Sequence, residues 1–152
     1  MSLRRIPAPG RWGTEVFFLS SGPYGGTNLL GGAAPITANT TTTLRIGPVG
    51  RKARFLRLGA SAQTLVSDTD GTVLARVRKR NNGGGTTVSN DLDLEALTAN
   101  QASYAGPLTN VLESVLRFAA SDVVEIDIVN NSAAINTQPV ALCFTVEFAV
   151  LE

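Results

Sequence analysis

Residues 139–152 read PVALCFTVEFAVLE, a stretch in which apolar side chains recur at every second position. Residues 123–131, VVEIDIVNN, repeat this alternation with acidic side chains on the second face. A period of two is typical of a strand that buries one face. The predicted buried faces consist of Val140, Leu142, Phe144, Val146, Phe148 and Val150 in the first stretch, and of Val124, Ile126 and Ile128 in the second. The two stretches therefore predict a β protein.

Shorter strand candidates precede them, separated by turn residues. Residues 15–19 (EVFFL), 40–46 (TTTTLRI) and 53–62 (ARFLRLGASA) are rich in the β-branched and aromatic residues that suit a pleated sheet. Between the first two, residues 20–39 consist mainly of Gly, Pro and small side chains. A loop of that length inside one domain is commonly a functional or binding segment.

A charged hairpin is predicted in the middle of the chain. Residues 72–80 (TVLARVRKR) and 91–98 (DLDLEALT) both alternate, and residues 81–90 (NNGGGTTVSN) between them are typical of a turn or a flexible tip. One pairing of the two strands places opposite charges on a single face. In that pairing Arg80 faces Asp91, Arg78 faces Asp93, Arg76 faces Glu95, and Val77 meets Leu94 on the other face. Such pairs predict a solvated, salt-bridged face rather than a nucleic-acid groove.

The whole pattern predicts an all-β fold. Seven or eight short strands with turns between them favour an antiparallel jelly roll or β-sandwich of about eight strands. At most one short helix is expected, within residues 109–120 (TNVLESVLRFAA), capped by Thr109 or Asn110. Residues 1–13 carry Pro, Gly and three Arg without either period, so we expect an extended N-terminal arm before a single domain of residues 14–152.

Composition excludes several kinds of chemistry. The chain of 152 residues and 15.9 kDa contains no His and one cysteine, Cys143. The sequence therefore lacks His-based triads, His-based zinc sites, an intrachain disulfide and a thiolate cluster. No apolar run is long enough to span a membrane, and the N-terminus does not resemble a secretory signal, so we expect folding in the cytoplasm of a host cell. Residues 1–90 hold twelve of the thirteen basic residues but three of the twelve acidic ones, an asymmetry that the charged hairpin is expected to reduce.

Three short motifs suggest chemistry, and each has a simpler interpretation. Glu125 and Asp127 could form a glycosidase carboxylate pair, although acids two residues apart are also expected on the polar face of a strand. Residues 67–71 (SDTDG) resemble the start of a calcium loop but lack its distant Glu, so a plain turn is predicted. Residues 47–55 (GPVGRKARF) lack the spacing of a phosphate loop. They contribute to a basic patch that either meets an acidic partner or is solvated, made of Arg51, Lys52, Arg54 and Arg57. No enzyme, metal or cofactor is predicted.

The aromatic residues of predicted loops are a further candidate site. Trp12 belongs to the arm, Tyr24 to the Gly-rich segment, and Tyr104 to a predicted loop at residues 103–107. Exposed aromatic rings can stack on sugars or fill a pocket of a partner protein. Packing beneath a loop is the alternative for each of them.

In layout, the chain resembles the small decoration, or cement, proteins of tailed-bacteriophage capsids. The features that carry the resemblance are the arm, the Gly-rich segment, TTTTLRI at residues 40–46, LRFAASDVVEIDIVNNSAAINTQP at residues 116–139, and the apolar last strand. The resemblance implies a jelly-roll-like protein on the capsid surface that clamps the major capsid protein or other virion subunits. It also implies a homo-oligomer, with a trimer favoured over a dimer, and no membrane or direct nucleic-acid partner. The predicted partner-binding residues are Arg4, Arg5, Ile6, Trp12, Tyr24, Arg51 and Lys52, together with residues 22–35.

Two other functions remain open from the sequence alone. The first is a carbohydrate- or receptor-binding β-sandwich of a phage tail or fibre, which would use Trp12, Tyr24 and Tyr104. The second is a hydrolase, which would use Glu125 and Asp127.

Overall fold

The computed structural model of the chain describes residues 15–24 and 36–151, and for residues 22–24 the backbone alone. The predicted arm and most of the Gly-rich segment lie outside the described residues. The elements in chain order are β1 (Val16–Tyr24), β2 (Thr41–Pro48), β3 (Ala53–Ser61), β4 (Ser67–Asp68), β5 (Val73–Asn81), β6 (Gly84–Thr87), β7 (Leu92–Asp93), β8 (Ser103–Ala105), α1 (Glu113–Leu116), β9 (Arg117–Phe118), β10 (Val123–Asn130), β11 (Ile135–Thr137) and β12 (Leu142–Val150). Within the described ranges, no helix is long and apolar enough to cross a membrane.

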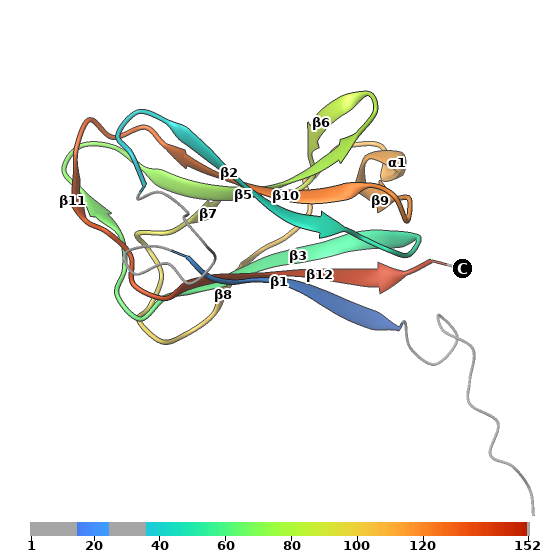
Figure 1. Ribbon diagram of the computed structural model, residues 1–152, viewed down its shortest axis with the longest axis horizontal. Helices are drawn as coiled ribbons and strands as arrows, with labels where there is room; N and C mark the ends of the chain where they lie inside the picture. Colours follow the sequence, from blue (N-terminus) through green and yellow to red (C-terminus); the bar gives the residue numbers. More distant parts are fainter. Residues whose placement is uncertain (1–14, 25–35, 152) are drawn as a thin grey trace, which may run out of the picture.

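Two antiparallel sheets form the body of the molecule (Figure 1). Sheet A has the strand order β1-β12-β3-β8, with β9 also paired to β3. Sheet B has the order β2-β10-β5-β6, with β7 also paired to β5. The chain passes back and forth between the two sheets through β1, β2, β3 and β5, so the central strands β12 and β10 pair with neighbours that are distant in the chain. This interleaving of two sheets is the jelly-roll arrangement, and the predicted fold class is confirmed.

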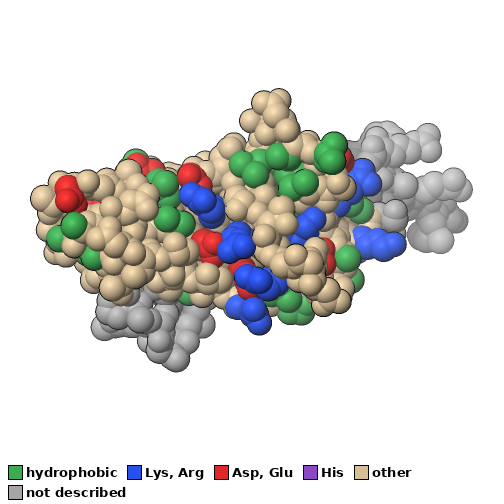
Figure 2. Space-filling view, turned by 90° about the horizontal axis from the view of Figure 1, so that it is seen from above, with side chains coloured by type: hydrophobic (Ala, Val, Ile, Leu, Met, Phe, Trp, Pro, Cys, Tyr) green, Lys and Arg blue, Asp and Glu red, His purple; other side chains and the backbone are tan. Residues whose placement is uncertain are grey.

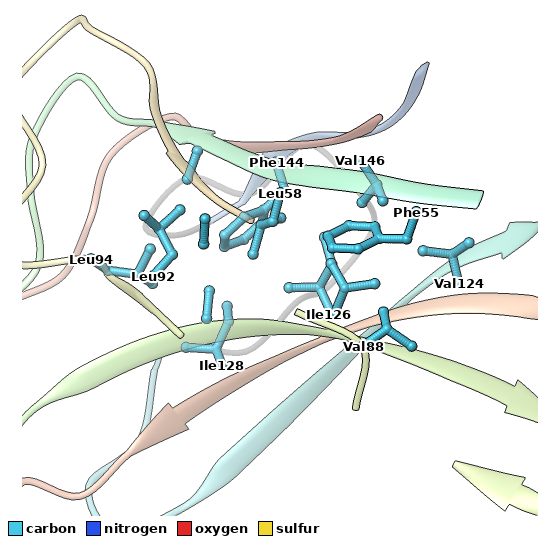
Figure 3. Close-up of a cluster of buried hydrophobic side chains, with 14 of the residues drawn as sticks. Phe55, Leu58, Val88, Leu92, Leu94, Val124, Ile126, Ile128, Phe144 and Val146 are labelled. Atoms are coloured by element: carbon cyan, nitrogen blue, oxygen red, sulfur yellow. The ribbon is translucent and has the colours of Figure 1, made fainter. Parts of the chain in front are cut away.

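The core lies between the two sheets (Figure 3). Phe55, Leu58, Phe144 and Val146 point inward from sheet A and meet Val124, Ile126 and Ile128 from sheet B. The alternation of the last strand is confirmed from Leu142 to Val150, where every second side chain is buried. An aromatic cluster extends the core around Phe148, whose ring centroid lies 5.4 Å from that of Phe17, 5.1 Å from that of Phe118 and 6.2 Å from that of Phe55. Each buried side chain of this size contributes about 1.5–3 kcal/mol to folding.

The predicted charged hairpin is wrong in its register. Strand β5 turns at once through Asn82 and Gly83 into β6, so Arg78 lies opposite Thr87 and Arg80 opposite Gly85. The Oδ1 atom of Asn81 accepts a hydrogen bond from the Gly83 N–H at 2.9 Å, which tightens this turn. Since the chain reverses at the first available turn, the second half of the predicted tip becomes a strand.

The acidic stretch that follows pairs with the first residues of β5, and not with its last residues as predicted. Asp93 lies opposite Leu74, and Leu92 lies opposite Ala75. Consequently neither the predicted pairing of Arg80 with Asp91 nor that of Arg78 with Asp93 occurs, and Glu95 lies near Asp68 instead of Arg76.

The predicted helix occupies only a small part of residues 109–120. Helix α1 is a single turn, and its N-cap is Leu112, without a side-chain cap from Thr109 or Asn110. The next two residues, Arg117 and Phe118, pair with β3 as strand β9 and bury the Phe118 ring. Tertiary pairing therefore overrides the local helical pattern.

Two predicted loops are strands. Residues 103–105 form β8 at the edge of sheet A, with Tyr104 opposite Gly59. The backbone of β1 continues to Tyr24, which lies opposite Leu142. Both aromatic residues are therefore held by a sheet and not by a loop.

Candidate interaction surfaces

The outer face of sheet B carries interleaved basic and acidic side chains across its middle (Figure 2). At its centre Glu125, only 1% exposed, accepts hydrogen bonds from the Arg80 Nε atom at 2.9 and 3.0 Å and from Arg45 Nη2 at 3.1 Å. Burial acts to raise the pKa of Glu125, but the hydrogen bonds and charges of Arg80 and Arg45 outweigh it, so this pKa lies below its usual value. The carboxylate fastens β10 to its neighbours on both sides.

A second carboxylate on β10 is held in the same way. Asp127 accepts a hydrogen bond from Arg78 Nη1 at 3.2 Å and one from the Thr43 hydroxyl at 2.6 Å. The third arginine of β5, Arg76, donates through Nη2 to Asp91 at 3.0 Å. The prediction that these arginines share an ion-paired face is right in kind, but two of their partners come from β10 and not from residues 91–98.

This arrangement bears on the hydrolase hypothesis. A glycosidase needs one carboxylic acid whose pKa is raised so that it can donate a proton. Glu125 has its pKa lowered by two guanidinium groups, and Asp127 is held by a guanidinium and a hydroxyl. The pair has the geometry of a structural ion-pair network.

The outer face of sheet A is different in character. It exposes Phe18 of β1 and Tyr104 of β8, whose side chains are 59% and 52% exposed. A hollow of about 80 Å³ lies between them. Its floor is made of small side chains from β3 and β12. The ion pair of Arg57 with Glu147 borders the hollow on a third side. We call this hollow the sheet A trough; it is lined by Phe18, Arg57, Gly59, Ala60, Ser61, Ala102, Tyr104, Cys143, Thr145 and Glu147.

Local sequence explains how the trough is built. Phe17 and Phe18 are adjacent in a strand, so one ring must point into the core and the other outward. Gly59 lies opposite Tyr104, and a Cβ atom at Gly59 would approach the Tyr104 ring to 2.9 Å. The absence of that atom lets the ring lie across β3. The Arg57 guanidinium is 3.9 Å from the centre of the same ring, within the range of a cation–π contact.

Three of the four residues of the predicted basic patch lie where β2 turns into β3. Arg51 donates to Glu15 at 2.7 Å, and this hydrogen bond, together with the Arg51 charge, lowers the pKa of Glu15. Arg54 is paired with Glu113. Lys52 is exposed beside them. Arg57 faces the sheet A trough, so the four basic residues do not form one continuous patch.

The other predicted partner residues stay predictions. Arg4, Arg5, Ile6 and Trp12 lie outside the described residues, and Tyr24 is described by its backbone alone. Phe18, which sequence reasoning did not select, is the exposed aromatic residue that faces Tyr104 across the trough. The adjacent aromatic pair in EVFFL was the signal that could have identified it.

Lys79 was not selected from the sequence either, although the alternation in TVLARVRKR places it on the same face as Val77 and away from the arginines. It points away from the arginine face and is 8% exposed. Its ammonium group donates to the carbonyl oxygens of Ser114, Val115 and Arg117 at 3.1, 3.0 and 2.8 Å. Lys79 thereby ties the segment that carries α1 to the inner face of sheet B.

Comparison with known proteins gives a likeness in structure. No family model and no curated protein matches the sequence. A chain described as part of the cyanophage Pam1 capsid asymmetric unit matches with a TM-score of 0.51 and 20% identity, over 97% of this chain and 94% of that one. The two chains share a fold. A chain from the structure of infectious bursal disease virus, Gx strain, matches with a TM-score of 0.42 and 11% identity, over 90% of this chain and 32% of that chain.

Proposed function

We propose that this protein is a non-enzymatic structural component of a phage particle, which decorates the capsid surface and stabilises it as a symmetric oligomer. The observation that carries the proposal is the likeness to a chain of the cyanophage Pam1 capsid asymmetric unit, because that match covers almost the full length of both chains. The predicted layout of the sequence, with an N-terminal arm before the jelly roll, supports the same role.

The chemistry of the described residues is compatible with this role. Both acids of β10 are bound to arginines, and the part of the chain that the structure describes contains no group of side chains suited to a metal ion. A decorating protein needs no active site, since symmetric attachment at several points increases its avidity. The oligomer is proposed to be a trimer, with a dimer as the second possibility, and its partner to be the major capsid protein or another virion subunit.

We place the capsid contact at the end of the molecule that carries Arg51 and Lys52. These two residues lie in the β2–β3 turn, beside the start of β1, where the chain enters from residues 1–14. The contact is proposed to include Arg4, Arg5, Ile6 and Trp12 from that preceding segment. Tyr24 and residues 25–35 are proposed as a second contact.

The first test asks where the protein resides. Purified particles from the source of the sequence would be imaged by electron microscopy and analysed by mass spectrometry, and the isolated protein would be sized by light scattering. We expect the protein at symmetric positions on the particle surface and a trimeric or dimeric mass. A monomer that is absent from particles would overturn the proposal.

The second test asks where contact is made. Lys52→Glu reverses an exposed charge in the proposed contact, and Thr86→Glu introduces a charge on an exposed residue of β6, the edge strand of sheet B that lies furthest from β2 (Figure 1). In a co-sedimentation assay with particles stripped of this protein, Lys52→Glu should weaken binding at least fivefold, while Thr86→Glu should bind normally. Equal binding of the two variants would contradict the placement.

A further inference from the structure

The sheet A trough is a second candidate site, separate from the proposed capsid contact. Strand register places its groups in rows across the sheet: Phe18 is opposite Glu147, and Glu147 is opposite Arg57. In the next row Thr145 is opposite Gly59, which is opposite Tyr104. Since β1 and β8 are three strand spacings apart and the two residues lie in neighbouring rows, their backbones stand roughly 16 Å apart, with small side chains between them.

From this arrangement we propose that the protein binds a carbohydrate in the sheet A trough, between the rings of Phe18 and Tyr104. Phe18 can present an apolar ring face to the C–H groups of a sugar ring, whereas Tyr104 carries the Arg57 guanidinium on its ring and offers its hydroxyl group. Here the rings stand at the two sides of a hollow instead of forming a continuous apolar patch.

Polar groups in the trough suit sugar hydroxyls. Within the described residues, Glu147 uses Oε2 and Arg57 uses Nε for their mutual hydrogen bond. Glu147 Oε1 and the two terminal nitrogens of Arg57 remain available, so an acceptor and several donors stand side by side. Neighbouring hydroxyl groups of a sugar can donate to Glu147 Oε1 and accept from the terminal nitrogens of Arg57. The Tyr104 ring beneath the guanidinium holds these donors in place.

The same groups argue against a protein occupant. Glutamate is depleted at protein interfaces, and covering the ion pair of Arg57 with Glu147 by apolar surface would remove water from both charges. A sugar replaces that water with its own hydroxyl groups. The trough is therefore better suited to a small polar ring than to a buried protein contact.

Titration of the full-length protein with named sugars tests this proposal. The panel contains glucose, galactose, mannose, N-acetylglucosamine, maltose and lactose, and the measurements are saturation-transfer NMR and amide chemical shifts. We expect saturable binding to at least one sugar, with the amide shifts concentrated at Gly59, Thr145 and Tyr104. A panel without saturable binding, or shifts confined to sheet B, would overturn the proposal.

Variants then test the trough directly. Tyr104→Ala and Glu147→Gln should each weaken binding at least tenfold. Leu112→Ser is the matched control, because it removes a side chain that is 76% exposed and does not line the trough. Thermal melting checks that each variant is folded, and the amide shifts of the unaltered protein serve as an independent readout. Unchanged binding in both trough variants would refute the assignment, and so would a change of oligomeric mass in Phe18→Ser without sugar binding, which would identify the face as a protein interface.

Discussion

The strongest quantitative prediction concerns Glu125 and its two arginines. Arg80 reaches both oxygens of this carboxylate and is 39% exposed, whereas Arg45 reaches one oxygen and is 66% exposed. A hydrogen bond to a charged group contributes about 1.5–3 kcal/mol, while exposed ion pairs contribute about 0.2–1 kcal/mol. A double-mutant cycle of Arg80→Gln with Glu125→Gln should therefore give a coupling free energy of about 2 kcal/mol. The cycle of Arg45→Gln with Glu125→Gln should give less than about 1 kcal/mol.

Urea denaturation at pH 7 is the appropriate assay, because guanidinium chloride would itself screen the charges. Adding 1 M NaCl should reduce the coupling of Arg45 more than that of Arg80, whose partner atoms are better shielded from water. Asp93 provides a matched control on the same sheet. Arg78→Gln and Asp93→Asn should show no coupling, since Asp93 lies opposite Leu74 and Arg78 is bound to Asp127. Coupling of Arg45 equal to or larger than that of Arg80 would refute the claim that burial and two-point contact make the Arg80 pair the stronger one.

The same carboxylate predicts a pH dependence. The pKa of Glu125 is lower in the folded protein than its usual value of 4.5, so the unfolded chain binds the proton more tightly. The stability that Glu125 contributes is present above pH 4.5 and is lost as the pH falls through the lowered value. In Glu125→Gln this part of the acid-induced loss should disappear, which urea midpoints at pH 7, 4.5 and 3 would measure. An unchanged pH profile in the variant would show that the carboxylate is not stabilised by its arginines.

Three further predictions address other parts of the fold. Burial raises the pKa of Glu95, and the neighbouring carboxyl group of Asp68 raises it further, so Glu95→Gln should increase stability at pH 7 by about 0.2–1 kcal/mol, a gain that vanishes as the pH falls to 4.5 in urea titrations. Lys79→Met removes three hydrogen bonds to carbonyl oxygens and should cost about 2 kcal/mol, seen in calorimetry as a melting temperature lower by about 4–8 °C. Gly59→Ala places a Cβ 2.9 Å from the Tyr104 ring, so it should shift the Tyr104 ring resonances at a cost of about 0.5–1.5 kcal/mol.

The faces of the strands could be predicted from sequence, but their neighbours could not. Alternation in residues 142–150 specifies which side chains are buried, because the period is a property of the strand itself. The partner of Arg78 depends on which strand lies beside β5, and that strand, β10, is distant from it in the chain. A signal was present, since Arg78 and Arg80 have the same spacing as Glu125 and Asp127. That match does not distinguish a distant strand from the hairpin partner that local reasoning prefers.

The candidate site was harder to predict for a similar reason. The sheet A trough takes its walls from β1 and β8 and its floor from β3 and β12, four segments spread over most of the chain. Tyr104 could be selected by its aromatic side chain, but β8 is three residues long, too short for a period to show that it is a strand. The role of Gly59 follows from its position opposite Tyr104 and has no signature in the surrounding sequence.

The two outer faces differ in how much water they must lose when something binds. On sheet B, Glu125 and Asp127 are already paired with arginines. A binding partner would have to remove water from these guanidinium groups without offering them a new carboxylate, which costs free energy. On sheet A the exposed rings of Phe18 and Tyr104 gain by leaving water, and the ion pair between them keeps free hydrogen-bonding atoms. We therefore expect a ligand on sheet A and none on sheet B. Since Lys52 does not line the trough, we expect the trough to accept its ligand while the proposed contact at Lys52 is made.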